Sequence, residues 1–165
     1  RDQKMSIVMY GETSLGEKSG DVLIGEDEID DLVDEMVREM HDRGGVGLAA
    51  PQVGENLRIF VWNHDGSEGV AVNPSLSYPE ASIEAETALE GCLSAPGVYV
   101  PMTRPARVTL RAQNLSGKDF EIEAEGVLAR IFQHEMDHLD GNCIMDLLNR
   151  QERRMLARRL RRSSP

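Results

Sequence analysis

The stretch QHEMDHLDG, residues 133–141, restricts the folds open to this chain more than any other part of the sequence. His134, Glu135 and His138 match the pattern H-E-x-x-H, which on a helix places two imidazoles one turn apart around a metal ion. Apolar residues recur at helical spacing around this pattern, which predicts a helix over 125–141. Its apolar side consists of Val127, Leu128, Ile131, Phe132, Met136 and Leu139. We therefore predict a largely buried helix that carries two metal ligands and a carboxylate.

Two histidines do not complete such a site, because a catalytic zinc-type centre takes three side chains and leaves one position open. Ile144 stands where the extended protease pattern has its third histidine, and Glu152, in an arginine-rich tail, is a poor candidate. Upstream, Cys92 lies in the non-helical stretch EGCLS, from which a thiolate could approach the helix. We expect Cys92 to be the third ligand. One cysteine with two histidines favours ferrous iron or zinc over magnesium or calcium, without choosing between the first two.

A glycine-bearing segment, GVGLAAPQVG at 45–54, carries Gln52 as its one hydrogen-bonding side chain. Gly45, Gly47 and Ala50 match the dinucleotide-binding fingerprint G-x-G-x-x-A, but that fingerprint must follow a strand and open a helix. Here a predicted helix precedes the glycines, so we reject the dinucleotide interpretation. The segment instead predicts a tight strand or loop whose backbone can lie against a substrate, with a glutamine amide that could donate to an oxyanion.

The rest of the chain alternates between helical and extended patterns. Residues 26–43 repeat apolar side chains at helical spacing and then meet two glycines, which predicts an amphipathic helix. A last helix is expected from Asn149, which forms a variant of the capping box with Glu152. The predicted strands are 58–62, 70–74, 106–114 and 119–125, with a hairpin turn at 114–119. This order of elements predicts an α+β fold.

The length of 165 residues, with 40% of them hydrophobic, suits one compact domain over 1–165. Residues 1–4 precede Met5 and are given no role. The chain has no apolar run long enough for a membrane span and no signal-peptide pattern, so we expect a cytoplasmic protein without membrane association. Cys92 and Cys143 are then expected to be thiols, with Cys143 in the core.

The formal net charge of −11 is unevenly distributed. Residues 150–165 contain seven arginines against Glu152 alone, a local charge of +6, so the remaining body carries −17. An acidic body argues against a general nucleic-acid binder, DNA included. The basic tail, residues 149–165, is either an ordinary solvated helix face or a local contact for an anionic partner.

Three segments, GVGLAAPQ, EGCLS and QHEMDH, in this order and at these separations, resemble the three signature motifs of the peptide deformylases. The similarity extends to the leading helix, the VNP after the second strand and the C-terminal helix, from about Met5 onward. The resemblance implies an α+β fold in which antiparallel sheets surround the helix with the two histidines. It also implies an activity, the hydrolytic removal of formyl from the N-terminal formylmethionine of new bacterial or organellar polypeptides, with release of formate.

The resemblance also implies the roles of the residues at the metal. Cys92, His134 and His138 would hold one divalent ion, with water in the fourth position. Fe²⁺ is the expected metal, and Zn²⁺, Ni²⁺ or Co²⁺ are the alternatives. Glu135 would accept the proton of the attacking water and deliver it to the leaving amine.

Other roles implied by the resemblance concern the substrate backbone and the reacting oxygen. The Gln52 amide and the Leu93 backbone N–H would stabilise the negative oxygen of the tetrahedral intermediate. The peptide would lie extended and pair with the backbone at Val46 and Gly91, and Gly47 is expected among the substrate-binding residues. The substrates, and hence the expected partners, are N-formylmethionyl nascent peptides.

The methionine side chain of the substrate would enter an apolar pocket lined by Val46, Val127 and Ile131. Arg130 falls at a pocket position that is usually apolar in relatives, and we expect its stem to cover the pocket wall while its charge reaches solvent. Tyr99 occupies a place where many members have arginine. Both departures concern side-chain preference rather than the metal chemistry.

Two functions of other classes are set against this one. An endopeptidase could use H-E-x-x-H on internal peptide bonds, but the chain lacks the third His or Glu ligand of such enzymes. A catalytically silent binding module would have little need of both Glu135 and Gln52. For the basic tail, the alternative to a solvated helix is docking on ribosomal RNA, where deformylases meet nascent chains.

Overall fold

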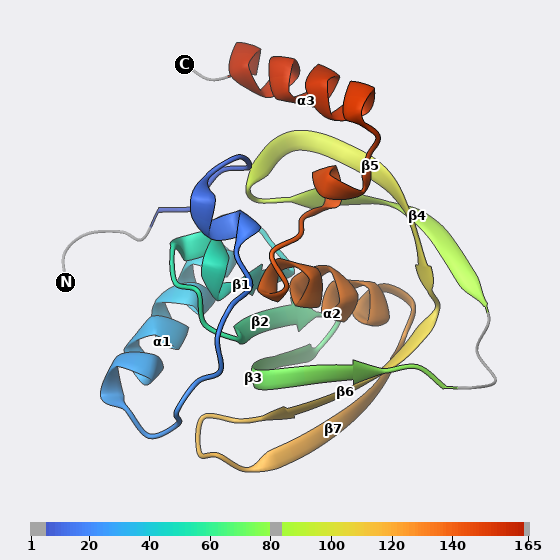
Figure 1. Ribbon diagram of the computed structural model, residues 1–165. Helices are drawn as coiled ribbons and strands as arrows, with labels where there is room; N and C mark the ends of the chain where they lie inside the picture. The colour runs from blue at the N-terminus through green and yellow to red at the C-terminus, as the bar shows by residue number, and fades with distance from the viewer. Residues whose placement is uncertain (1–5, 80–83, 164–165) are drawn as a thin grey trace.

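The computed structural model describes residues 6–79 and 84–163, so residues 1–4 lie outside it. In Figure 1, helix α2 lies between a large and a small antiparallel sheet. The large sheet has the order β1 (Gly47–Ala49), β2 (Ile59–His64), β3 (Ser67–Ser77), β6 (Arg107–Gln113) and β7 (Asp119–Glu125). The small sheet pairs β4 (Ala85–Cys92) with β5 (Ala95–Pro105). The helices are α1 (Asp27–Asp42), α2 (Gly126–Leu139) and α3 (Arg150–Ser163), with short 3₁₀ turns η1 (Thr13–Gly16), η2 (Ala50–Val53) and η3 (Ile144–Leu147). The predicted α+β fold, with antiparallel sheets around the H-E-x-x-H helix, is confirmed.

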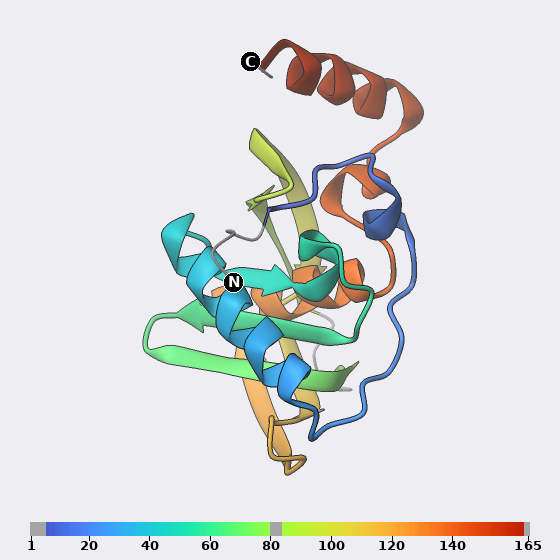
Figure 2. The same cartoon turned by 90° about the vertical axis from the view of Figure 1, so that its left-hand side faces the viewer.

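Strand β2 organises the core because a different helix covers each of its faces. Phe60 and Trp62 face α2, where the rings of Trp62 and Phe132 meet edge to face with centroids 5.1 Å apart. Ile59 and Val61 point the other way, into the apolar cluster on α1. Figure 2 shows α1 lying across that face of the sheet. Because side chains alternate along a strand, a strand between two helices requires an uninterrupted apolar run.

Helix α2 is fixed at its C-terminal end by an arginine from outside the helix. Arg58 donates to the carbonyl of Leu139 at 3.1 Å and forms an ion pair with Asp140 at 3.0 Å. These contacts satisfy a carbonyl that the last helical turn leaves unpaired and place a cation at the negative end of the helix dipole. The helix that carries the histidines therefore has a defined end as well as a buried face.

Most of the predicted elements are found within a few residues of their expected bounds. The helix over 26–43 is α1, and the helix over 125–141 is α2. Asn149 and Glu152 bond reciprocally, since Glu152 N donates to Asn149 Oδ1 at 2.9 Å and Asn149 N donates to Glu152 Oε1 at 3.3 Å. The predicted capping box at the start of α3 is therefore confirmed.

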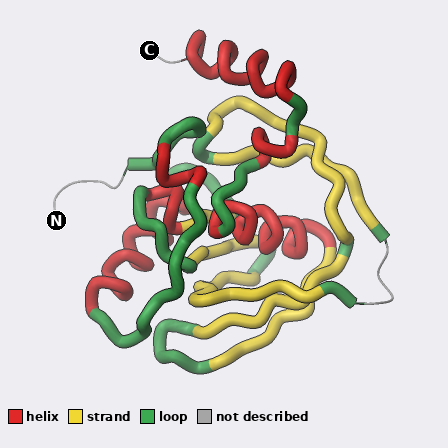
Figure 3. The backbone as a smooth tube through the Cα atoms, viewed as in Figure 1, coloured by secondary structure: helices red, strands yellow, loops and turns green. Residues whose placement is uncertain are grey.

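Strands β4 and β5 were not predicted from the sequence. Most side chains of β4 are exposed, so the strand has no apolar alternation that would reveal it. The two strands curve around α2 as a hairpin separate from the large sheet, which is visible in the tube of Figure 3. Within the described parts of the chain, no helix is long and apolar enough to cross a membrane.

Candidate active site

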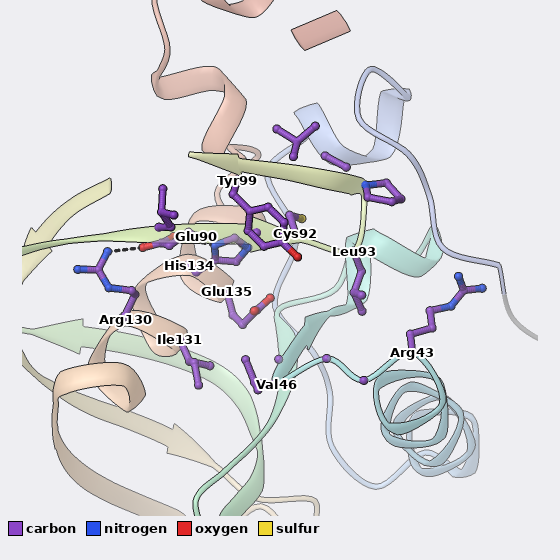
Figure 4. A pocket seen from close by; sticks show the side chains of 18 of the residues that line it. Arg43, Val46, Glu90, Cys92, Leu93, Tyr99, Arg130, Ile131, His134 and Glu135 are labelled. Carbon is purple, nitrogen blue, oxygen red and sulfur yellow. Dashed lines mark hydrogen bonds and ion pairs between the residues drawn. The ribbon is translucent and has the colours of Figure 1, made fainter. Parts of the chain in front are cut away.

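A cavity of about 650 Å³ opens between α2, the β4–β5 sheet and the segment that leads from α1 into β1 (Figure 4). Its lining includes four apolar side chains that are 46 to 67% exposed: Val46, Leu89, Tyr99 and Val127. Apolar side chains gathered in the open around a cavity mark a binding site rather than a defect of the core. A cavity of this size suits a small molecule, or one peptide side chain together with its backbone.

The three predicted metal ligands come together beside this cavity. His134 and His138 lie one turn apart on α2, and Cys92 is the last residue of β4; their ligand atoms all lie within 4.8 Å of one another. Cys92 Sγ is 3.3 Å from His138 Nε2. One thiolate and two imidazoles make a three-ligand set of the kind found around zinc or iron with one position left open.

Two buried polar atoms at the site have no protein partner. Among the residues that the structure describes, Glu135 Oε1 and His138 Nδ1 make no hydrogen bond. A buried carboxylate oxygen without a partner costs about 1–3 kcal/mol or more, so it calls for an explanation in what the site binds. Figure 4 shows the Glu135 carboxylate directed into the cavity near Cys92 and His134. The residues therefore fit a divalent metal with a water molecule beside it.

Glu135 is held in a dry, close-packed environment. Burial raises the pKa of this carboxyl to about 7, although the positive charge of His134 acts in the opposite direction. A divalent cation in the site would lower this pKa. A carboxyl group that titrates near neutral pH can both accept and release a proton. Strand β1 approaches closely: a Cβ on Gly47 would lie 2.5 Å from Glu135 Oε2, so a larger residue there would displace the carboxylate.

Glu90, on β4, orients the His134 ring through its Nδ1 atom. Its Oε1 is 2.9 Å from His134 Nδ1, and Arg104 on β5 donates to both oxygens, at 2.6 Å to Oε2 and 2.9 Å to Oε1. Burial would raise the pKa of Glu90, but hydrogen bonds from His134 and Arg104 and the charge of Arg104 lower it to about 2. A histidine bonded through Nδ1 keeps Nε2 for the metal.

Glu90 and Arg104 were missed by the sequence reasoning. One signal for Glu90 was present, because Glu90 and Cys92 are two residues apart and therefore point to the same face of a strand. It could be used only once β4 was known to be a strand. For Arg104 the sequence offered no signal, since its neighbour across the hairpin is set by the register of β4 with β5.

The prediction for Arg130 was wrong in one respect. Its side chain lines the cavity as expected, but the charge is largely buried instead of lying in solvent, because the side chain is only 12% exposed. Its guanidinium donates to Glu90 Oε2 at 2.6 Å and to the carbonyls of Met102 at 2.8 Å and Glu86 at 2.7 Å. A carboxylate and two strand carbonyls within reach replace the water that a solvent-exposed guanidinium would bind.

Gln52 is buried next to the predicted metal ligands, with 2% of its surface exposed. Its Oε1 accepts from Ala49 N at 3.0 Å, which fixes the orientation of the amide. The amide nitrogen is 3.5 Å from Cys92 Sγ and 3.3 Å from Ser94 Oγ. The contact with Ser94 is longer than an ordinary hydrogen bond, so an amide hydrogen remains available to a stronger acceptor. Leu93, next to Cys92, also lines the cavity.

The remaining predicted substrate residues also line the cavity, each from the expected segment. They are Val46, Gly47, Gly91, Val127 and Ile131. Tyr99 lies against Gly91, where a Cβ would be 2.8 Å from the tyrosine ring, so glycine lets the ring pack onto the strand. The structure thus brings all the predicted metal, catalytic and substrate residues to one place.

The fold and the site define a class of protein, the hydrolases in which a metal ion and a neighbouring carboxylate act together on a carbonyl carbon. Comparison of the chain with known proteins identifies one family within this class. The family model described as Polypeptide deformylase matches residues 4–154, and this chain belongs to that family.

Individual relatives agree with the family match. The peptide deformylase of Thermotoga neapolitana is 40% identical over 152 residues, which is 92% of each chain. That of Dictyoglomus thermophilum is 48% identical over 124 residues, covering 73% of this chain and 79% of the relative. The crystal structure of peptide deformylase from Ehrlichia chaffeensis superposes with a TM-score of 0.92 at 32% identity, covering 97% of this chain and 96% of that one.

The activity follows from this membership. The chain is a metal-dependent hydrolase that removes the N-terminal formyl group from the formylmethionine of newly synthesised polypeptides and releases formate. The relatives are deformylases, so neither the endopeptidase nor the silent binding module is supported.

Proposed function

We propose that Cys92, His134 and His138 hold the metal of this deformylase and that Glu135 moves the proton in the reaction. The observation that carries the proposal is the unpartnered, buried Glu135 Oε1 beside a cluster of one thiol and two imidazoles. When bound, the metal supplies a Lewis acid that brings the pKa of water close to neutrality. We propose Fe²⁺ as this metal, with Zn²⁺, Ni²⁺ or Co²⁺ able to replace it, since thiolate and imidazole suit all four.

In this proposal, Glu135 acts twice. It first accepts the proton of the water that attacks the formyl carbon, and it then delivers that proton to the amine that leaves. Its position supports both steps, because the carboxylate is directed into the cavity and Gly47 leaves room for it there. The low exposure of Glu135, 4%, keeps bulk water from exchanging the proton between the steps.

The oxygen of the tetrahedral intermediate needs hydrogen-bond donors because it carries negative charge. We assign this role to the Gln52 amide, 3.5 Å from Cys92 Sγ, and to the backbone N–H of Leu93, the residue after Cys92; both residues line the cavity. The backbone N–H of Ala49 donates to Gln52 Oε1, so the amide nitrogen of Gln52 faces the site and needs no reorganisation during the reaction.

Two strand edges border the cavity and suit an extended peptide. Among the described strands, β1 pairs only with β2, and β4 pairs only with β5. Asn63 N donates to the carbonyl of Val46, so the next residue, Gly47, directs its own N–H and carbonyl to the open edge of β1. A peptide lying between Gly47 and Gly91 could then place its first side chain among Val46, Val127 and Ile131.

The first expected result is formate release from formyl-Met-Ala-Ser by protein purified without oxygen and loaded separately with Fe²⁺, Zn²⁺, Ni²⁺ or Co²⁺. Fe²⁺ is expected to give the highest kcat/KM, and the metal-free protein should release no formate. Metal content and circular dichroism are measured on the same samples. A folded protein that carries metal at one per chain and yet releases no formate with any ion would contradict the proposal.

A further part of the proposal concerns where the enzyme works and what α3 contacts. We place the chain in the cytoplasm of a bacterial-type cell, where formylated polypeptides are made, and propose that α3 contacts the ribosome. Arg150, Arg154 and Arg158 recur every four residues along one side of α3, next to Met155, which is 60% exposed. Figures 1 and 2 show α3 projecting from the body of the molecule, as a helix that reaches an anionic surface would.

Replacing Arg150, Arg154 and Arg158 with glutamine is expected to weaken co-sedimentation with ribosomes at least about tenfold at low salt, because lost phosphate contacts reduce counterion release. Raising the salt should weaken the wild type similarly. Glutamine at Arg107 and Arg111, two exposed arginines of the large sheet, is the matched control. Equal binding by the triple variant and the wild type would mean that α3 is an ordinary solvent-exposed helix without a role in ribosome binding.

A further inference from the structure

The three residues that cluster for metal binding come from two parts of the fold that no pairing between the described strands joins. His134 and His138 belong to α2, which packs on the large sheet, whereas Cys92 ends β4 in the separate two-stranded sheet. A metal site tolerates little variation in ligand separation. Contacts between side chains must therefore hold the β4–β5 hairpin against α2. Several side chains make such contacts: Arg104 on β5 forms an ion pair with Asp137 on α2 at 2.8 Å, and Gln133 on α2 donates to the Pro105 carbonyl at 3.0 Å.

Arg130 makes the contact that reaches both strands. It lies one helical turn before His134 on α2, and its guanidinium reaches out of the helix to both strands of the hairpin. On β4 it donates to Glu90 Oε2 at 2.6 Å and to the Glu86 carbonyl at 2.7 Å; on β5 it donates to the Met102 carbonyl at 2.8 Å. Figure 4 shows Arg130 beside Glu90, with His134 on the other side of that carboxylate.

The carboxylate of Glu90 is clamped between two cations from opposite sides. Arg104 approaches from β5 and Arg130 from α2, and both donate to Oε2 at 2.6 Å. Oε1 is thereby directed at His134 Nδ1, 2.9 Å away. The side chains of Glu90, Arg104 and Arg130 are 5%, 8% and 12% exposed, so little water competes for these bonds. Charge-assisted bonds in such a setting are strong and directional.

We propose that Arg130 is a positioning residue for the metal site: it ties the β4–β5 hairpin to α2 and, through Glu90, orients His134 toward the metal. The proposal rests on the assignment of Cys92, His134 and His138 as ligands. Arg130 touches neither metal nor reacting atoms in this scheme. It acts by fixing the separation between Cys92 and the two histidines and the rotation of the His134 ring.

The test is Co²⁺ binding to the metal-free protein, followed by the visible absorption of the bound ion. Arg130→Met keeps an unbranched side chain of similar length but removes all three hydrogen bonds. Because supporting partners of metal ligands contribute about 10- to 100-fold to affinity, the variant is expected to bind Co²⁺ at least about tenfold more weakly, with an altered spectrum. Arg111→Met is the matched control, since Arg111 is 56% exposed and, among the described residues, bonds Ser77 and Glu121 on the large sheet.

Arg130→Lys separates positioning from a general loss of folding, because lysine keeps a cation near Glu90 but can form fewer of the three bonds. It should bind Co²⁺ with an affinity between those of wild type and Arg130→Met.

With saturating metal and formyl-Met-Ala-Ser, kcat should fall more than KM rises in both variants. Thermal unfolding of the metal-free proteins identifies any variant that does not fold, in which case the lysine variant decides.

Two results would overturn the proposal. One is Co²⁺ affinity and spectrum in folded Arg130→Met or Arg130→Lys that match the wild type, even if KM rises, because Arg130 would then be only part of the pocket wall. The other is an equal loss of affinity in Arg111→Met. Neither Co²⁺ measurement uses substrate. A wild type that binds Co²⁺ but releases no formate therefore contradicts the proposed catalytic roles and leaves this inference standing.

Discussion

Glu135→Gln is expected to lower kcat for formate release by about 10²- to 10⁴-fold, the range that a lost general acid–base typically costs. The glutamine amide fills the same space beside Gly47 but cannot accept a proton from water. The proposed ligands Cys92, His134 and His138 are untouched, so the metal content should remain that of the wild type. The measurement is kcat at equal metal occupancy with a formyl-Met peptide.

The control for this prediction is Glu123→Gln, which makes the same change on an exposed position of β7 and should leave kcat unchanged. A fully metal-loaded Glu135→Gln variant that retained more than about a tenth of wild-type kcat would remove Glu135 from the proton transfer, since even the weakest general catalysts contribute more than that.

The same variant has a stability signature in the metal-free state. Burial holds the pKa of Glu135 at about 7, against an ordinary value of 4.5, so between these pH values the folded chain keeps a proton that the unfolded chain releases. Wild-type stability from this group is therefore fully present below pH 4.5 and is lost as the pH rises through 7. Glu135→Gln should unfold at higher temperature than wild type at pH 8, with the difference vanishing near pH 4.

Gly47→Ala is expected to lower kcat/KM by about 10²-fold or more, the effect of moving a reacting group by roughly 1 Å. The added Cβ would lie 2.5 Å from Glu135 Oε2 and 3.0 Å from its Cδ, so the carboxylate must leave its position. Gly47 also offers its backbone to the peptide in the proposed binding mode, so KM should rise as well. The measurement is steady-state formate release, with metal content determined in parallel.

Gly20→Ala is the matched control, because a Cβ at Gly20 meets nothing within 4 Å. It should leave kcat/KM within about twofold of wild type, as most surface substitutions do. Activity of Gly47→Ala within a factor of a few of wild type would show that Glu135 can adapt, and would weaken the claim that its position in the cavity is fixed by β1.

The metal site illustrates how far local sequence patterns reach. One helix carries His134, Glu135 and His138. Because the period of a helix is known, their positions relative to one another could be predicted from the sequence. Cys92 was chosen by eliminating other ligands, and the structure brings its Sγ 3.3 Å from His138 Nε2. The proposed roles of these residues come from the chemistry of their side chains, and the short distances between their ligand atoms are compatible with those roles.

Residues outside the motifs were less predictable because their environment depends on partners distant in the chain. Arg130 was expected to reach solvent, as a long charged side chain at the mouth of a pocket commonly does. It instead bonds Glu90, 40 positions earlier in the chain. Strand β4, which supplies Glu90, was itself not predicted, since its exposed side chains leave no periodic apolar signal.

The sequence by itself determined the helices, four of the seven strands, the α+β class and the three motifs, because helical and strand periods and ligand chemistry are local properties of the chain. Only the tertiary structure decided how β4 and β5 fold over α2, and hence that two arginines clamp Glu90 behind His134 and that β1 presses Gly47 against Glu135. The physical reason is that these contacts join residues far apart in the chain, and their formation depends on the packing of whole elements rather than on any local preference.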